Sequence, residues 1–119
     1  VVHGTTAVAA DPHEIANVLG LEGISYMLQA AEAQPINIYF TLPSCVPATD
    51  METAGARLTA SDLEPFFSHE RIVALAEVMN YPGVIHKEKE VLQKITWAKM
   101  YDKPIDGHAP GLRGEEFTL

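Results

Sequence analysis

Apolar segments recur along the chain at regular intervals. Residues 5–10 read TTAVAA, residues 36–42 read INIYFTL and residues 72–76 read IVALA. The segments are short and rich in β-branched, small or aromatic residues, and turn-forming residues follow the second one, which is the pattern of buried strands. We therefore predict three strands in these segments and a short fourth strand in KPIDGHAPG, at residues 103–111, ending near His108.

The polar pattern after the first segment predicts a helix. Asp11, Pro12 and Glu14 stand in the order of an N-cap, a first helical residue and a capping-box acid. The apolar residues that follow fit a period of 3.6, and Gly20 and Gly23 predict a break near the middle.

Three more helical segments are predicted further along. Ser61 and Glu64 have capping-box spacing and open a short helix before the third strand. Apolar residues recur at helical spacing between Lys and Glu residues over residues 87–99. GLRGEEFTL, at residues 111–119, reads as the opening turn of another helix.

Strands that alternate with amphipathic helices predict an α/β fold with a parallel sheet, because parallel neighbours need crossover connections. We expect one domain over residues 1–119, a length that allows a single core. In such sheets ligands bind beyond the carboxyl ends of the strands. Polar residues gather at these four predicted ends: Asp11 and His13, Ser44 and Cys45, Glu77 and Asn80, Asp106 and His108.

Composition narrows the classes of partner. The net charge is −8 and the eight Lys and Arg residues are scattered, so the chain offers no basic stripe for nucleic acid or anionic lipid. No apolar run approaches the roughly 20 residues that span a bilayer. Cys45 is the single cysteine, so no internal disulfide forms within the chain, and we expect a reducing cytoplasm.

Glu77 and His108 are the pair that we place on a metal ion. A carboxylate and an imidazole suit Zn, Mn or Fe, and such an ion activates water for hydrolysis. Spacing alone leaves other readings open, since no HxH, HExxH or CxxC motif is present. A lone histidine at a strand end can also form a structural hydrogen bond. His13 can pack or cap its helix locally, and Cys45 can serve as a small buried apolar residue.

Four blocks carry a family resemblance. They are HGTTAVAADPHEIANVLG (residues 3–20), LPSCVPAT (42–49), AEVMNYPGV (76–84) and KPIDGHAPGL (103–112). In this order the blocks resemble the bacterial-type adenine deaminases of the amidohydrolase superfamily. The resemblance implies part of a (β/α)8 TIM barrel, with a site of one or two metal ions that hydrolyses adenine to hypoxanthine and ammonia.

The resemblance also implies residue roles. Glu77 matches a glutamate that binds metal and can bridge two ions, and His108 matches a histidine ligand. His13, Ser44, Cys45 and Asn80 become candidates for contact with the purine. The metal is expected to be Mn or Fe, with Zn as a further option.

The chain also departs from the family pattern. The HxH pair of the first barrel strand, the histidine of the sixth and the aspartate of the eighth have no counterpart here, so the chain corresponds to about strands two to five. Two other readings stay open: a related amidohydrolase that acts on another cyclic amidine or amide, and a non-catalytic α/β fragment that associates with itself.

The isolated 119 residues are predicted to form homo-oligomers, or to bind the rest of the enzyme, and to be inactive on adenine. Four parallel strands leave two open edges, which pair readily with other chains. Two metal ligands are too few for the family's site. Light scattering and an ammonia-release assay with added Mn, Fe or Zn measure both properties. A monodisperse monomer, or metal-dependent turnover, would contradict the respective expectation.

Overall fold

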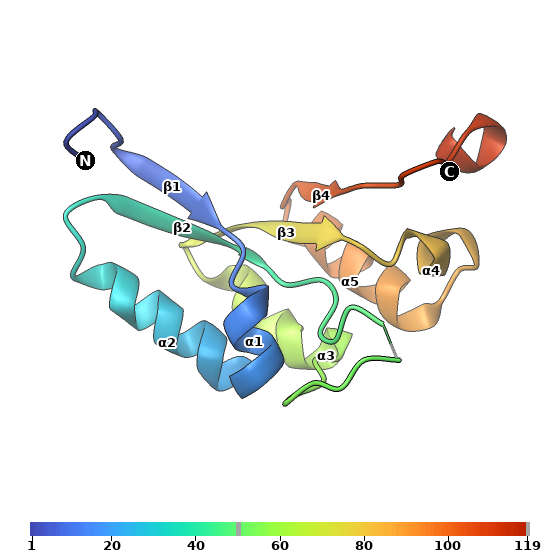
Figure 1. Cartoon of the computed structure of the whole chain (residues 1–119), viewed down its shortest axis with the longest axis horizontal. Helices are drawn as coiled ribbons and strands as arrows, with labels where there is room; N and C mark the ends of the chain where they lie inside the picture. Colours follow the sequence, from blue (N-terminus) through green and yellow to red (C-terminus); the bar gives the residue numbers. More distant parts are fainter. Residues whose placement is uncertain (50, 119) are drawn as a thin grey trace.

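The computed structural model describes residues 1–49 and 51–118 and contains one parallel sheet. Its strands follow one another in sequence order and all end at the same edge (Figure 1). They are β1 (Ala7–Ala10), β2 (Asn37–Leu42), β3 (Ile72–Val78) and β4 (Ile105–Gly107). The four predicted strands are confirmed, and β3 continues through Glu77 instead of stopping before it.

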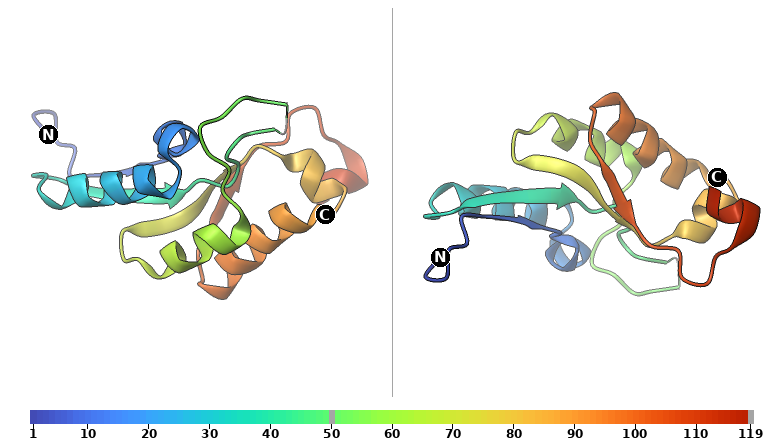
Figure 2. Two further views of the ribbon diagram at one scale, coloured as in Figure 1. Left: turned by 90° about the horizontal axis from the view of Figure 1, so that it is seen from below. Right: turned by 90° about the horizontal axis from the view of Figure 1, so that it is seen from above.

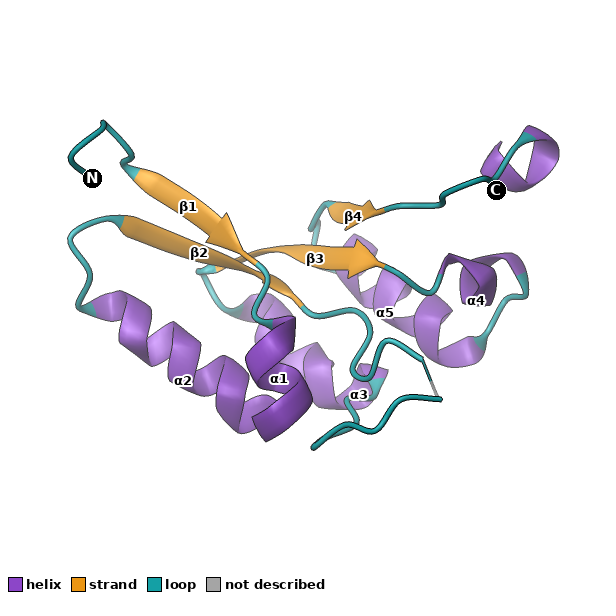
Figure 3. Ribbon diagram, in the orientation of Figure 1, coloured by secondary structure: helices purple, strands orange, loops and turns teal. Residues whose placement is uncertain are grey.

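All helical elements but the last lie between strands along the described chain, and the longer ones pack on one face of the sheet. Figure 2 shows α2, α3 and α5 on this face, and Figure 3 shows that loops connect them to the strand ends. The helical elements are α1 (His13–Leu19), α2 (Leu21–Glu32), α3 (Ala60–Leu63), η1 (Glu64–Ser68), α4 (Tyr81–Ile85), α5 (Lys89–Met100) and η2 (Gly114–Thr118). The last residue of the predicted C-terminal helix, Leu119, lies outside the described residues.

This arrangement is that of consecutive β/α units in a (β/α)8 barrel. Such a barrel keeps its strands in sequence order with helices outside, whereas a doubly wound sheet reverses its order and carries helices on both faces. The chain is therefore a partial barrel, as the sequence predicts. Within the described residues, β1 and β4 are the sheet edges, and Val8 and Ile105 on these strands are exposed.

The hydrophobic core fills the space between the sheet and the helices. Phe40, Leu42, Ile72 and Leu75 from β2 and β3 are almost fully buried. They meet side chains from each covering helix: Ile24 and Leu28 of α2, Leu63 of α3, Phe67 of η1, and Val91 and Ala98 of α5. Burial of each large side chain contributes about 1.5–3 kcal/mol, so this layer holds the strand ends in place.

Among the described residues, no helix is long and apolar enough to cross a bilayer.

The α1–α2 junction depends on two glycines. Gly20 has φ +62, a conformation that glycine adopts without strain, and it ends α1 where the sequence predicts a break. Gly23 lies inside α2, where a Cβ would approach the Ile15 carbonyl oxygen to 2.8 Å. The missing side chain lets the two short helices pack closely beside the end of β1.

Two of the predicted caps are wrong in detail. At α3 the cap is Thr59 with Asp62, two residues before the predicted pair of Ser61 and Glu64. Glu64 instead accepts a hydrogen bond from the Tyr101 hydroxyl at 2.6 Å, a contact between distant parts of the chain. At α1 Pro12 occupies the cap position, although the Asp11 carboxylate still accepts a bond from the His13 amide at 3.1 Å.

Thr59→Ala is predicted to lower the free energy of unfolding by about 1 kcal/mol, because the Asp62 amide loses its side-chain acceptor. Hydrogen bonds from Thr59 lower the pKa of Asp62 below its ordinary 3.8. This stabilisation is therefore complete above pH 3.8 and is lost as the pH falls through the lower folded pKa. Urea unfolding at neutral and acidic pH measures both effects. Ser61→Ala is the control, and an equal loss in that variant would favour the other cap.

Candidate metal centre

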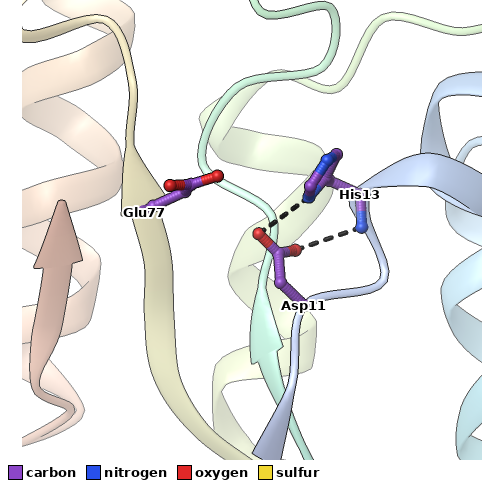
Figure 4. Close-up of side chains that lie close together, drawn as sticks. All are labelled: Asp11, His13 and Glu77. Atoms are coloured by element: carbon purple, nitrogen blue, oxygen red, sulfur yellow. Dashed lines mark hydrogen bonds and ion pairs between the residues drawn. The ribbon is translucent and has the colours of Figure 1, made fainter. Parts of the chain in front are cut away.

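The candidate site lies at the carboxyl edge of the sheet, where Glu77 occupies a central position. Leu75 pairs with Ile105 and Val78 with Gly107, so β3 has two residues, Ala76 and Glu77, where β4 has one. This extra residue is a β-bulge, a feature that redirects side chains at strand ends. The Glu77 side chain points toward the end of β1 (Figure 4).

His108 follows β4 on one side of Glu77. Its Nδ1 atom lies 3.1 Å from Oε2 of Glu77, with 54% of the histidine side chain and 36% of the glutamate side chain exposed. A pair this exposed contributes little to stability, because water screens the charges. The structure thus brings together the two residues that the sequence places on a metal.

Asp11 and His13 follow β1 on the other side of Glu77. Oδ2 of Asp11 lies 2.9 Å from Nδ1 of His13. Oδ1 of Asp11 accepts a hydrogen bond from the His13 backbone amide (Figure 4). One ligand atom from each of Asp11, His13 and Glu77 lies within 4.8 Å of the others. Imidazole and carboxylate donors at this spacing suit a divalent transition metal.

The electrostatics of this cluster reflect its partial burial. Burial raises the pKa of Asp11, and the nearby Glu77 charge adds to this, while the contacts with His13 oppose it. Burial lowers the pKa of His13, but the contact with Asp11 and the charges of Asp11, Glu14 and Glu77 outweigh it and leave the pKa raised. The His13 ring therefore holds a proton more firmly than an isolated histidine.

The other predicted residues lie around a separate pocket of about 520 Å³ beside α5. Ser44, Cys45 and Asn80 line it, whereas Glu77 and His108 are not among the described residues that do. Ser44 and Cys45 are buried, and the Ser44 hydroxyl donates to the Glu77 carbonyl at 2.6 Å. The structure therefore connects Ser44 to Glu77 through the backbone.

The Asn80 side chain is engaged at the start of α4. Its Oδ1 accepts a bond from the Gly83 amide and its Nδ2 donates to Glu88, each at 3.0 Å. These contacts cap the helix that follows β3 and fix the turn beyond Glu77.

Sequence reasoning misses part of the surroundings of two residues. It expects Asp11 at a strand end and as a helix cap, but not among the candidate metal ligands. Lys94 is one of the polar residues of the helix predicted over residues 87–99, yet it is only 7% exposed. The sequence does indicate this burial, because Lys94 lies three residues after Val91 and four before Ala98, on the apolar stripe of α5.

Comparisons with known proteins agree with this architecture. The model of the amidohydrolase family matches residues 1–118. The chain is 60% identical to an adenine deaminase of Desulfatibacillum aliphaticivorans over 116 residues, which are 98% of the chain and 20% of that protein. Identity to adenine deaminase 2 of Carboxydothermus hydrogenoformans is 56%, and to the adenine deaminase of Clostridium acetobutylicum 50%, each over 97% of the chain and 20% of the relative. The chain thus spans about one fifth of these relatives.

Asp11→Asn is predicted to lower the pKa of His13, because the substitution removes the carboxylate charge nearest to the ring. NMR titration of the imidazole in metal-free protein measures the change. Glu14→Gln is the control: Glu14 lies 3.5 Å from His13 Nε2 but is 92% exposed, so its removal is expected to change the pKa less. A larger change in Glu14→Gln would contradict this account.

Proposed function

Because the chain belongs to the amidohydrolase family, we propose that it forms part of the catalytic barrel of an adenine deaminase, which hydrolyses adenine to hypoxanthine and ammonia. The observation that carries the proposal is the meeting of Glu77, His108, Asp11 and His13 at one edge of a parallel sheet. In barrels of this kind, that edge is where catalytic residues stand. The names of the relatives supply the substrate.

Glu77 and His108 are the proposed metal ligands, and the donor set fits this role. Glu77 lies between His108 on one side and the Asp11–His13 pair on the other, so its carboxylate can serve one ion or bridge two. Manganese or iron is proposed, with zinc as the alternative, because mixed carboxylate and imidazole donors accept all three. When bound, such an ion supplies Lewis-acid activation of water and substrate.

The residues of the chain supply proton handling. Hydrolysis forms a bond between C6 of adenine and the water oxygen and breaks the bond from C6 to the amino nitrogen. One proton of the water leaves with ammonia, and the other ends on the purine ring. His13, oriented by Asp11 at 2.9 Å, is the proposed carrier of a proton at this edge.

Purine contacts are proposed for His13, Ser44, Cys45 and Asn80. Their support is position: all four follow strand ends, and three of them line the pocket beside α5. The enzyme is further proposed to be a cytoplasmic homo-oligomer that binds neither nucleic acid nor membranes. The single, free Cys45, the acidic composition and the exposed edge strands support these assignments.

The test is an ammonia-release assay on the complete barrel protein loaded with manganese, with adenine, other aminopurines and cyclic amides as substrates. Turnover of adenine at the highest kcat/KM supports the proposal. Turnover of a cyclic amide without adenine deamination would instead assign the protein to another activity of the same family.

Glu77→Gln and His108→Gln are predicted to reduce bound metal and deamination together by roughly tenfold or more, since direct ligands matter at least as much as their outer partners. Metal analysis and steady-state kinetics on the complete enzyme measure the two quantities. Glu22→Gln, an exposed residue of α2, removes the same charge and should change neither. Normal metal content and normal turnover in Glu77→Gln would refute the ligand assignment.

A further inference from the structure

Lys94 is a buried lysine in the middle of α5. Its Nζ atom donates to the carbonyl oxygens of Ser44 and Leu58, each at 2.8 Å. Lysine is almost never buried to this extent without partners, because removal of its charge from water is costly. Burial accordingly lowers the pKa of Lys94. A residue retained at such a cost calls for a specific role.

The two carbonyls that Lys94 binds mark the ends of one long connection. Ser44 comes two residues after β2 ends, and Leu58 comes two residues before α3 begins. The Leu58 amide also donates to the Val46 carbonyl at 2.9 Å, so the ends are paired with each other. Lys94 therefore holds both ends of the β2–α3 connection against α5.

Ser44 passes this anchorage on to Glu77. A hydroxyl has one proton to donate, and the contact of 2.6 Å with the Glu77 carbonyl uses it. The same carbonyl accepts a second hydrogen bond, from the Met79 amide at 3.0 Å. Two hydrogen bonds thus fix the peptide unit of Glu77 at the bulge, where regular strand pairing is interrupted.

We propose that Lys94 is a positioning residue for Glu77, acting through Ser44 to fix the backbone that directs the carboxylate toward His108 and the Asp11–His13 pair. The inference rests on the proposed function, since it takes Glu77 as a metal ligand. Ligand carboxylates bind well only when partners outside the metal's own ligands hold their orientation. The ammonium of Lys94 is one such partner, two hydrogen bonds away from the carboxylate-bearing residue.

The chain offers a matched control for a purely structural effect. Lys103 donates from Nζ to the Ile72 carbonyl at 2.6 Å, at the opposite end of β3. Lys103→Met and Lys94→Met each remove an ammonium that binds backbone carbonyls of the sheet region. Only Lys94 is connected to Glu77.

The experiment compares Lys94→Met, Ser44→Ala and Lys103→Met in the complete enzyme. Manganese affinity is measured by equilibrium dialysis without adenine, and hydrogen exchange of residues 74–80 in the metal-free protein. We expect Lys94→Met and Ser44→Ala to weaken manganese binding about 10- to 100-fold and to speed the exchange. In Lys94→Met the kcat should fall while KM for adenine stays unchanged. Lys103→Met should lower the melting temperature but bind manganese like the unsubstituted enzyme.

The double variant Lys94→Met/Ser44→Ala provides the second readout. If both residues act through one chain of hydrogen bonds, their effects should not add. The double variant should then bind manganese with the same affinity as the single variant that has the lower affinity. Manganese affinity unchanged in Lys94→Met, or weakened equally in Lys103→Met, would overturn the inference. Failure of the unsubstituted enzyme to deaminate adenine would refute the proposed function alone, because manganese affinity and exchange are read without substrate.

Discussion

Parallel pairing of the strands is the constraint on which the candidate site depends. Parallel neighbours need crossovers, and the helices that make them cover one face of the sheet. Every strand then ends at the same edge, so residues far apart in sequence meet there. Asp11 and Glu77 are 66 positions apart, yet their carboxylates belong to one cluster. The packing of the core between sheet and helices therefore determines which side chains meet at this edge.

The convergence of acids at this edge has an electrostatic cost. Burial is the main reason that the pKa of Asp11 is raised, and repulsion from the Glu77 carboxylate adds to it against the contacts with His13. A group of this kind is more stable when a cation neutralises it. Under the proposed function, a divalent ion bound at this edge would relieve the repulsion between Asp11 and Glu77, so the stability of the region would be coupled to metal affinity.

The sequence predicted what depends on local pattern. The strands, the break at Gly20 and the parallel order follow from apolar runs and turn residues, and the pairing of Glu77 with His108 follows from their positions at strand ends. Local spacing could not select the cap of α3, because Thr59–Asp62 and Ser61–Glu64 both have suitable spacing. In the structure Thr59 and Asp62 form the cap, while Glu64 accepts a hydrogen bond from Tyr101, the residue that follows α5. The partners of Lys94 could not be predicted either, since they are backbone carbonyls 36 and 50 positions away.

The connection between β2 and α3 is held at both ends, so the lining of the pocket beside α5 and the backbone position of Glu77 can change independently. Lys94 and the Val46–Leu58 hydrogen bond hold its two ends, and Ser44 at the first end donates to the Glu77 carbonyl. Loop closure costs only about 0.6 kcal/mol for each doubling of length, so insertions there are tolerated at little thermodynamic cost. Under the proposed function, substitutions in this segment, which lines the pocket beside α5, would therefore change contacts with the substrate while Ser44 keeps its bond to the Glu77 carbonyl.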